Sequence, residues 1–422
     1  MTKPQTPART LTPGHQLDTP DFERQPPGSI LHDFEALLGL IGDQGLPVTP
    51  GHQFAMKTLE SINQHLTHPL ELGLKRAMQK SYPHINGLYL VLRASGLAWI
   101  DTASKKPRLH LDPAVLASWC SLNAAERYFA LLKAWWGRSS EEMIGERESW
   151  GGDASMRVVQ FLKMLPNRGP LTFETPQDAE LLRYSPGIHH LALLDLFGLV
   201  ELRAMPPMEG KGWQPERVDL SAWGRALLGH FAAFMRQQSL VPEAESDMPI
   251  LDTADFFDSL ARFEHWSQLV RPQIPDWRQE LEIPEPPFQA GQHLFKVSLG
   301  ADCWRRIAIG GETDVDDLAD TILAAFDFDD SDHLYRFSYQ GRFGRTIAID
   351  HPNLAGESEY VADEIKVGDL ALRAGMRIDF LFDFGDRWRF ELTVEQVSDG
   401  PASQEPQLLE AHVRAPVQYD NW

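Results

Sequence analysis

The feature that most constrains the fold is an order of elements that occurs twice in the first half of the chain. A predicted helix ends at Ser95-Gly96, two short strands follow around a polar turn, and another helix begins at Pro113. About 102 residues after Gly96, the pair Gly198-Leu199 holds the same place in a second copy of this order. A left-handed glycine commonly ends a helix, and alternating strands bury one face each. We therefore expect two small units built in the same way.

The apolar spacing divides both copies into elements. The first copy has helices at 85–94 and 113–119 around strands at 97–100 and 108–111, and the second has helices at 189–196 and 221–234 around strands at 199–202 and 217–220. This order is typical of the later part of a winged-helix unit, so we expect winged-helix-like units at about residues 84–120 and 188–235. Between them, Asn123 and Glu126 have the spacing of a capping box and predict the start of an apolar helix.

The length of 422 residues predicts a multidomain chain, because single cores rarely grow beyond about 250–300 residues. Residues 1–29 are rich in proline and poor in apolar side chains, which predicts a disordered tail. Residues 30–240 form a mostly α N-terminal region that contains both winged-helix-like units. Residues 241–289 hold an aromatic-rich helix followed by several prolines, which is typical of a connector.

Residues 290–422 are predicted to form an α+β domain. Alternating stretches predict strands at 293–299, 304–309, 334–339, 345–349, 377–382 and 388–394. One helix follows Asp314, which we expect to cap it, with Val315, Leu318 and Ile322 on its apolar face. This order favours a β-grasp-like domain, in which one helix packs on a mixed sheet.

The charge is distributed unevenly. Residues 251–422 contain 15 Lys and Arg against 33 Asp and Glu, a net charge of −18 out of −21 for the whole chain. Such a surface repels phosphate and attracts basic partners, although solubility alone also accounts for it. No apolar run approaches the roughly 20 residues of a membrane span. With no secretory signal and only two cysteines, we expect a cytoplasmic, bacterial-type protein that does not bind membranes.

The last third of the chain resembles the plasmid pRiA4b ORF-3-like family, which also occurs as an insertion-element passenger protein. The matching stretches are 295–299, 304–307, 325–330, 333–337, 367–370, 383–388 and 415–419. The resemblance implies a bacterial or mobile-element domain of uncharacterised activity. Two departures are visible: the Cys-rich insertion of many members is missing, and Phe390 stands where many relatives have histidine.

Acidic residues gather at two places in this domain. They could bind a hard cation such as Mg²⁺ or Ca²⁺, could bind a protein partner, or could cap backbone amides in ordinary turns. No calcium-loop spacing is present, and no cofactor is predicted beyond this possible divalent metal. The candidate metal or partner-binding residues are Asp327, Asp329, Asp330, Asp332, His333, Asp383 and Asp386.

Five further residues are predicted to have structural roles. We expect Trp304 and Trp388 to anchor the core, and Gly385 to supply an unusual backbone angle in the turn 383–387. Arg305 and Arg306 alternate across a strand, so at least one should face outward, and nearby acidic residues predict an internal ion pair. His189-His190 is a possible ligand pair, but no carboxylate or thiolate stands near it at zinc spacing.

Basic residues at the two turns of the winged-helix-like units indicate nucleic-acid binding as an alternative function. The candidates are Lys105, Lys106, Arg108, Lys211 and Arg217. The surrounding residues 51–200 are nearly neutral, with 16 Lys and Arg against 14 Asp and Glu. Binding through so few cations would be weak and sensitive to salt.

No catalytic signature is complete, which favours a non-enzymatic interaction or accessory protein whose acidic C-terminal domain binds a protein partner. Two alternatives stay open. One is a DNA-binding accessory protein acting through the winged-helix units, and the other is a metal-dependent hydrolase that uses the C-terminal Asp cluster.

Overall fold

The computed structural model describes residues 17–104, 106–146, 152–165, 169–240, 258–329, 333–356, 358–403 and 405–418. The chain divides into two compact units. The first comprises residues 1–99 and 109–283, and the second comprises residues 284–422 together with Ile100–Arg108. Within the described part, no helix is both long and apolar enough to cross a membrane.

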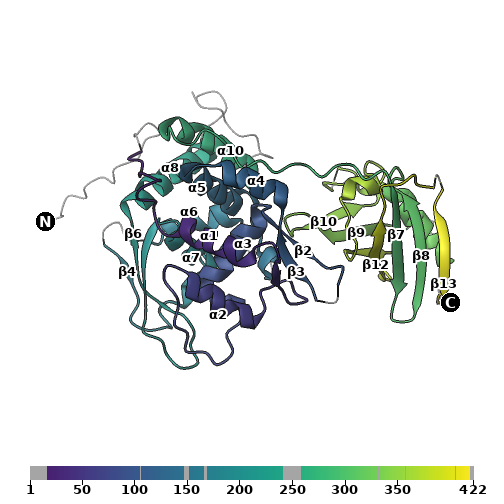
Figure 1. The fold of residues 1–422 in the computed structure, drawn as a ribbon, viewed down its shortest axis with the longest axis horizontal. Coiled ribbons are helices and arrows are strands. Elements are labelled where there is room, and N and C mark those ends of the chain that lie inside the picture. The colour runs from purple at the N-terminus through teal and green to yellow at the C-terminus, as the bar shows by residue number, and fades with distance from the viewer. Residues whose placement is uncertain are drawn as a thin grey trace. The chain divides into compact units, whose positions relative to one another are not determined.

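The helical part of the chain contains two successions of elements with the same order (Figure 1). The first is α1 (Ile30–Ile41), β1 (Leu46–Pro47), α2 (Met56–His65), α3 (Pro83–Ala94), β2 (Ala98–Asp101) and β3 (Arg108–Leu111). The second is α6 (Ala154–Leu162), β4 (Leu171–Thr172), the 3₁₀-helix η4 (Glu180–Arg183), α7 (Ile188–Leu196), β5 (Val200–Ala204) and β6 (Pro215–Leu220). Their small sheets also correspond, with strand orders β1-β3-β2 and β4-β6-β5.

The remaining helices join and cover these two successions. They are α4 (Pro113–Ser121), α5 (Ala124–Lys133), the π-helix η2 (Ala134–Arg138), η3 (Glu141–Ile144), α8 (Ala222–Leu240) and α10 (Ser259–Val270). Two short 3₁₀-helices, η1 (Gln79–Ser81) and η5 (Arg271–Gln273), complete this part.

Local sequence signals explain several element ends. Gly96 and Gly198 have φ angles of 75° and 65°, so the expected left-handed glycines do follow α3 and α7. The capping box at the start of α5 is confirmed, because Asn123 and Glu126 each accept a hydrogen bond from the other's backbone N–H. Asp314 precedes α11 (Val315–Ala325) as expected, but its side chain makes no capping hydrogen bond.

Helices α3 and α7 form the centre of the helical unit. Every residue of α3 is buried, and so is most of α7. At their crossing, a methyl group on Gly87 would come within 2.8 Å of Leu193 Cγ. His84 Nε2 of α3 also lies 3.3 Å from Asp195 Oδ2 of α7. The two similar successions therefore pack together through their third helical elements.

The N-terminal residues show where the expected tail ends. Residues 1–16 lie outside the described residues, whereas residues 17–29 pack on the helical unit. Phe22 is 4% exposed, and its ring lies 5.1 Å from that of Tyr128 and 6.0 Å from that of Trp223. Burial of one large aromatic side chain holds this short segment in place. Much of the expected connector, residues 241–257, also lies outside the described part, and α10 follows it.

The C-terminal unit contains one seven-stranded sheet in the order β10-β9-β11-β12-β7-β8-β13 (Figure 1). The strands are β7 (Gln292–Leu299), β8 (Cys303–Gly310), β9 (Tyr335–Gln340), β10 (Thr346–Asp350), β11 (Arg377–Phe382), β12 (Trp388–Val397) and β13 (Gln407–His412). Two 3₁₀-helices, η6 (Pro352–Leu354) and η7 (Val367–Leu370), lie between β10 and β11 in the chain.

The expected mixed sheet is wrong, because every pair of strands is antiparallel. Local alternation of side chains is the same in parallel and antiparallel strands, so it does not distinguish them. The sequence also gave no sign of β13, whose six residues are all exposed and therefore do not alternate in burial.

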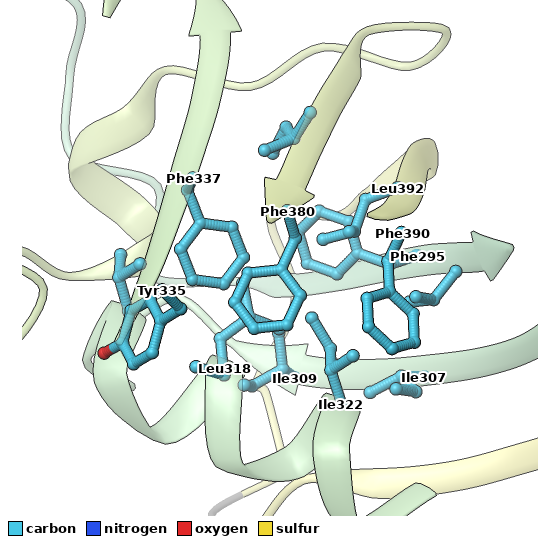
Figure 2. Close-up of a cluster of buried hydrophobic side chains, with 14 of the residues drawn as sticks. Phe295, Ile307, Ile309, Leu318, Ile322, Tyr335, Phe337, Phe380, Phe390 and Leu392 are labelled. Carbon is cyan, nitrogen blue, oxygen red and sulfur yellow. The ribbon is translucent and has the colours of Figure 1, made fainter. Parts of the chain in front are cut away.

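One face of the sheet and α11 enclose the core of this unit. Ile307 and Ile309 of β8, Phe380 of β11 and Leu318 and Ile322 of α11 point into it (Figure 2). The opposite side chains of the strands are mostly polar and partly exposed. The sheet is therefore covered on one face by its own helix, as is common for antiparallel sheets.

Candidate functional site

The first group of acidic candidates lies after α11. Asp327 is exposed and has a left-handed φ of 63°, and its N–H donates to the Ala324 carbonyl. Asp329 is held by Gln418, whose Oε1 accepts from its N–H at 2.5 Å and whose Nε2 donates to its carbonyl at 2.8 Å. Asp330 and Asp332 lie outside the described residues. The described residues of this group thus make contacts at the end of α11 and with Gln418.

The second group forms the turn between β11 and β12. Asp383 Oδ1 accepts from the N–H groups of Gly385 and Asp386, at 2.9 and 3.3 Å. The left-handed residues of the turn are Asp383 and Arg387, with φ of 54° and 60°. Gly385 is not among them, so the expected role of this glycine is wrong. Aspartate tolerates the left-handed region because its side chain can hydrogen-bond locally.

The two acidic groups meet where His333 approaches Asp383. His333 Nδ1 lies 3.5 Å from Asp383 Oδ2, and the Asp383 carboxylate is almost buried. Within the described residues, these candidates do not bring three possible ligand atoms together. Asp386 remains exposed on the surface of the turn. The pair supports local structure, and it offers a metal fewer ligands than such ions usually take.

The Trp-Arg-Arg stretch of β8 divides its side chains between the two faces of the sheet. Arg305 is 6% exposed, and its guanidinium donates to the carbonyls of Ala325, His412 and Val413 at 2.7, 3.2 and 3.0 Å. Arg306 faces outward and pairs with Glu395 and Glu410. The ion pairs of this stretch are therefore formed by the outward-facing Arg306, while the buried Arg305 binds backbone carbonyls.

The two tryptophans also differ. Trp388 is half-buried and packs on Phe328, with ring centroids 4.9 Å apart. Trp304 lies on the outer face, where its ring contacts Lys296 Nζ at 4.8 Å and stacks on His412 at 5.4 Å. Because residues alternate along β8, the inward position of Arg305 places its neighbour Trp304 outward. Trp304 is therefore not the core anchor that we expected.

Further acidic residues influence the hydroxyl of Tyr335. This hydroxyl donates to Asp316 of α11. Burial, the hydrogen bond to Asp316 and the negative charges of Asp316, Asp320 and Asp363 raise the pKa of Tyr335. We call Asp316, Asp320 and Asp363 the α11 acidic group. The i, i+4 spacing of the two helical residues is visible in the sequence, but the contribution of Asp363 depends on the fold.

The helical unit contains a buried cluster of Glu141, His189 and His190. Glu141 Oε2 lies 3.2 Å from His189 Nε2, and Glu141 Oε1 lies 3.2 Å from His190 Nε2. The guanidinium of Arg157, which is 5% exposed, lies 3.8 Å from the same carboxylate. Local sequence gives no signal for this contact, because 49 positions separate Glu141 from His190.

The protons of this cluster can be assigned from its neighbours. Trp135 Nε1–H donates to His190 Nδ1 at 2.9 Å, so the proton of the neutral imidazole lies on Nε2 and points to Glu141. Burial and the neighbouring His189 lower the pKa of His190 to about 4. Although burial alone would raise it, the hydrogen bond with His190 and the nearby imidazole of His189 hold the pKa of Glu141 well below its usual range.

The same three side chains place possible ligand atoms within 4.8 Å of one another, so they could in principle hold a metal ion. A metal on His190 Nε2 would require the proton to move to Nδ1, where it would oppose the Trp135 N–H. Arg157 already supplies a positive charge to the carboxylate. The cluster thus fits a structural network of ion pairs and hydrogen bonds better than a metal centre.

The candidate nucleic-acid residues have different surroundings. Lys106 and Lys211 are exposed, and Lys105 lies outside the described residues. Arg217 of β6 pairs with Asp219 at 3.0 Å, and on β5 next to it Arg203 pairs with Glu216 at 2.6 Å. Acidic partners therefore already compensate part of the positive charge of the second hairpin.

Comparison with known proteins confirms the resemblance of the last third of the chain. Residues 295–418 match the family described as plasmid pRiA4b ORF-3-like protein. A search of curated proteins gives no match. One solved structure, a protein of unknown function MM3350 from Methanosarcina mazei Go1, is 21% identical over 28% of this chain and 68% of its own, with a TM-score of 0.25.

Proposed function

We propose that this chain is a non-enzymatic interaction protein whose α11 acidic group binds a basic segment of a protein partner. The helical unit supplies the scaffold. The observation that carries this proposal is the gathering of Asp316, Asp320 and Asp363 around one tyrosine hydroxyl, at the surface of a unit with a large excess of acidic residues.

Three carboxylates with like charge repel one another, so a cationic ligand that neutralises them gains binding energy. Asp320 and Asp363 are exposed, and Asp316 is half-buried. A Lys- or Arg-rich segment is the chemistry that matches this surface.

We further propose that the two similar successions are winged-helix units. Each has the order helix, strand, helix, helix, strand, strand if the short η1 before α3 is left aside, with the 3₁₀-helix η4 in the third place of the second unit. A winged-helix protein that reads DNA places its third helix in the major groove. Here the third helices α3 and α7 are buried against each other, which supports a scaffold role over DNA reading.

The two alternatives have less support. A DNA-binding role would depend on the hairpin cations alone, and such binding would involve few phosphates. A metal-dependent hydrolase would require the acidic residues at 327–333 and 383–386 to converge on one ion, and the described contact between them, His333 with Asp383, offers a metal too few ligands.

A binding comparison with matched variants tests the main proposal. A fluorescent oligo-arginine peptide would be titrated with the full chain at low salt. We expect the combined Asp316→Asn, Asp320→Asn and Asp363→Asn variant to bind it at least about tenfold more weakly, a loss of about 1.4 kcal/mol of binding free energy. The variant Asp302→Asn, Asp399→Asn and Glu405→Gln removes the same charge from other exposed positions and should bind nearly as wild type does. Equal losses in both variants would contradict a specific site.

A further inference from the structure

A hollow of about 420 Å³ opens at the surface of the helical unit, beside the start of α5. We call it the α5 hollow. Its lining comes from the segment before α1, from α1 itself and from residues 122–127. Phe22, Leu31 and Leu122 supply apolar side chains to its wall, and Phe22 and Leu122 are each 4% exposed. Small-molecule sites usually have volumes of about 300–1,000 Å³ and a largely apolar lining, so the hollow has the size and the walls for a small organic ligand.

The charged groups of the α5 hollow are two carboxylates and one guanidinium, those of Glu23, Glu35 and Arg127. Arg127 is already engaged, because it donates to Glu35 Oε1 at 3.0 Å and to the carbonyls of Trp119 and Cys120 at 3.2 and 3.4 Å. An anionic ligand would have to compete with these hydrogen bonds and would meet a surplus of negative charge. The hollow therefore favours a cation.

Each of the two carboxylates uses one oxygen in the fold. Glu23 Oε1 accepts from the Ala124 N–H at 3.0 Å, and Glu35 Oε1 accepts from Trp119 Nε1 at 2.9 Å as well as from Arg127. The second oxygen of each carboxylate has no hydrogen-bond donor among the residues that the structure describes. Both side chains are thus held in place by one oxygen and can accept from a ligand with the other.

We propose that the α5 hollow binds a small organic cation, an ammonium or guanidinium group on an apolar body. The cationic group donates to the second oxygens of Glu23 and Glu35, and the apolar body packs on Phe22, Leu31 and Leu122. A divalent metal ion matches this site less well, because Mg²⁺ and Ca²⁺ take about six or more oxygen ligands and do not use apolar walls.

Such a ligand also connects two parts of the helical unit. Glu23 belongs to the segment that precedes α1, whereas Glu35 lies within α1. The Gln25 N–H of this segment donates to the Asp21 carbonyl at 2.8 Å. A ligand that binds only while the segment is in place makes local opening of this hydrogen bond rarer. Hydrogen exchange at residues 21–25 therefore reports on binding at this position.

Calorimetric titration of the full chain with 2-phenylethylammonium tests the site. We expect saturable binding in the millimolar range or tighter, and much weaker binding of 2-phenylethanol, which has a similar shape without the charge. The Glu23→Gln, Glu35→Gln double variant should bind the ammonium at least about tenfold more weakly. Glutamine keeps the oxygen that accepts from Ala124 N–H or from Trp119 Nε1, so this variant should keep its circular dichroism spectrum and melting temperature.

A matched control separates the site from general attraction to an acidic chain. The Glu71→Gln, Glu174→Gln double variant removes the same charge from exposed positions of the helical unit outside the hollow and should bind as wild type does. The ammonium should slow hydrogen exchange at residues 21–25 in wild type and in this control, but not in Glu23→Gln, Glu35→Gln. Absence of saturable binding, equal binding of 2-phenylethanol, equal losses in the two double variants, or unchanged exchange at residues 21–25 in wild type would each overturn the proposal.

Discussion

Gly87 of α3 and Leu193 of α7 lie so close that the smallest side chain on Gly87 would come within 2.8 Å of Leu193 Cγ. The same added atom would lie 3.2 Å from the His189 carbonyl oxygen. This contact brings together the third helical elements of the two successions. It buries the helices that a winged-helix protein would place in DNA, and it therefore supports the scaffold role that we propose for the helical unit.

Identical substitutions at two helical glycines test this packing. Alanine is favoured over glycine inside a helix by about 0.5–1 kcal/mol. An added methyl group at Gly39 of α1 meets no atom within 4 Å, so Gly39→Ala should raise the free energy of unfolding. Gly87→Ala should lower it by about 1–3 kcal/mol, because the overpacked crossing must move apart. Chemical denaturation measures both, and a stabilising Gly87→Ala would show that the helices are not in contact.

The two neighbouring arginines of β8 should differ in their contribution to stability. Arg305→Met leaves the partly buried carbonyls of Ala325, His412 and Val413 without this donor, at a cost of about 3 kcal/mol. Arg306→Met removes only surface ion pairs and should cost less than about 1 kcal/mol. Hydrogen exchange at residues 407–412 should increase far more in Arg305→Met. Similar exchange in the two variants would mean that Arg305 does not hold β13.

The buried cluster should make stability depend on pH. In the unfolded chain a histidine binds a proton near pH 6.5, whereas folded His190 stays neutral down to about pH 4. Stability is therefore full above about pH 6.5 and is lost as the pH falls toward 4, by about 3 kcal/mol. The lowered pKa of Glu141 acts in the same direction at lower pH, because its stabilisation is lost as the pH falls from the ordinary glutamate pKa, about 4.3, through the lower folded value.

Comparison of wild type with His190→Gln isolates this effect. Glutamine can also donate and accept hydrogen bonds, but it does not titrate. The pKa values of His230 and His293 are lowered by burial too, so wild type and variant share that background. Unfolding free energies measured from pH 7 to 4 should fall less steeply in the variant. If the two curves of unfolding free energy against pH run parallel, His190 does not contribute to the loss of stability in acid.

Local signals in the sequence located most helices and strands but not how they pair. The capping box at Asn123 and the strand ends at Arg377 and Phe382 depend on adjacent residues, and the structure has them where the sequence predicts. The antiparallel order of the sheet depends on contacts between distant strands, which alternation alone does not encode. Likewise, the left-handed turn residue is Asp383 and not Gly385, because a side-chain hydrogen bond stabilises it.

The candidate site likewise combines features that local sequence shows with features that depend on contacts between distant residues. Asp316 and Asp320 can be assigned to one helix face from their spacing, but Asp363 joins them only through the folded chain. The contact of Glu141 with His189 and His190 brings together residues on η3 and α7, and no spacing rule connects them. The burial of α3 against α7 likewise follows from tertiary packing, and it changes how the hairpin cations are interpreted.

One titration series with two ligands tests most directly whether the α11 acidic group binds a basic partner and not DNA. The full chain would be titrated against the oligo-arginine peptide and against a duplex DNA, each over a range of salt concentrations. We expect the peptide to bind, its affinity to fall with salt, and the DNA to bind more weakly than the peptide at every salt concentration. Tighter binding of the DNA, with the peptide unaffected by Asp316→Asn, Asp320→Asn and Asp363→Asn together, would contradict it.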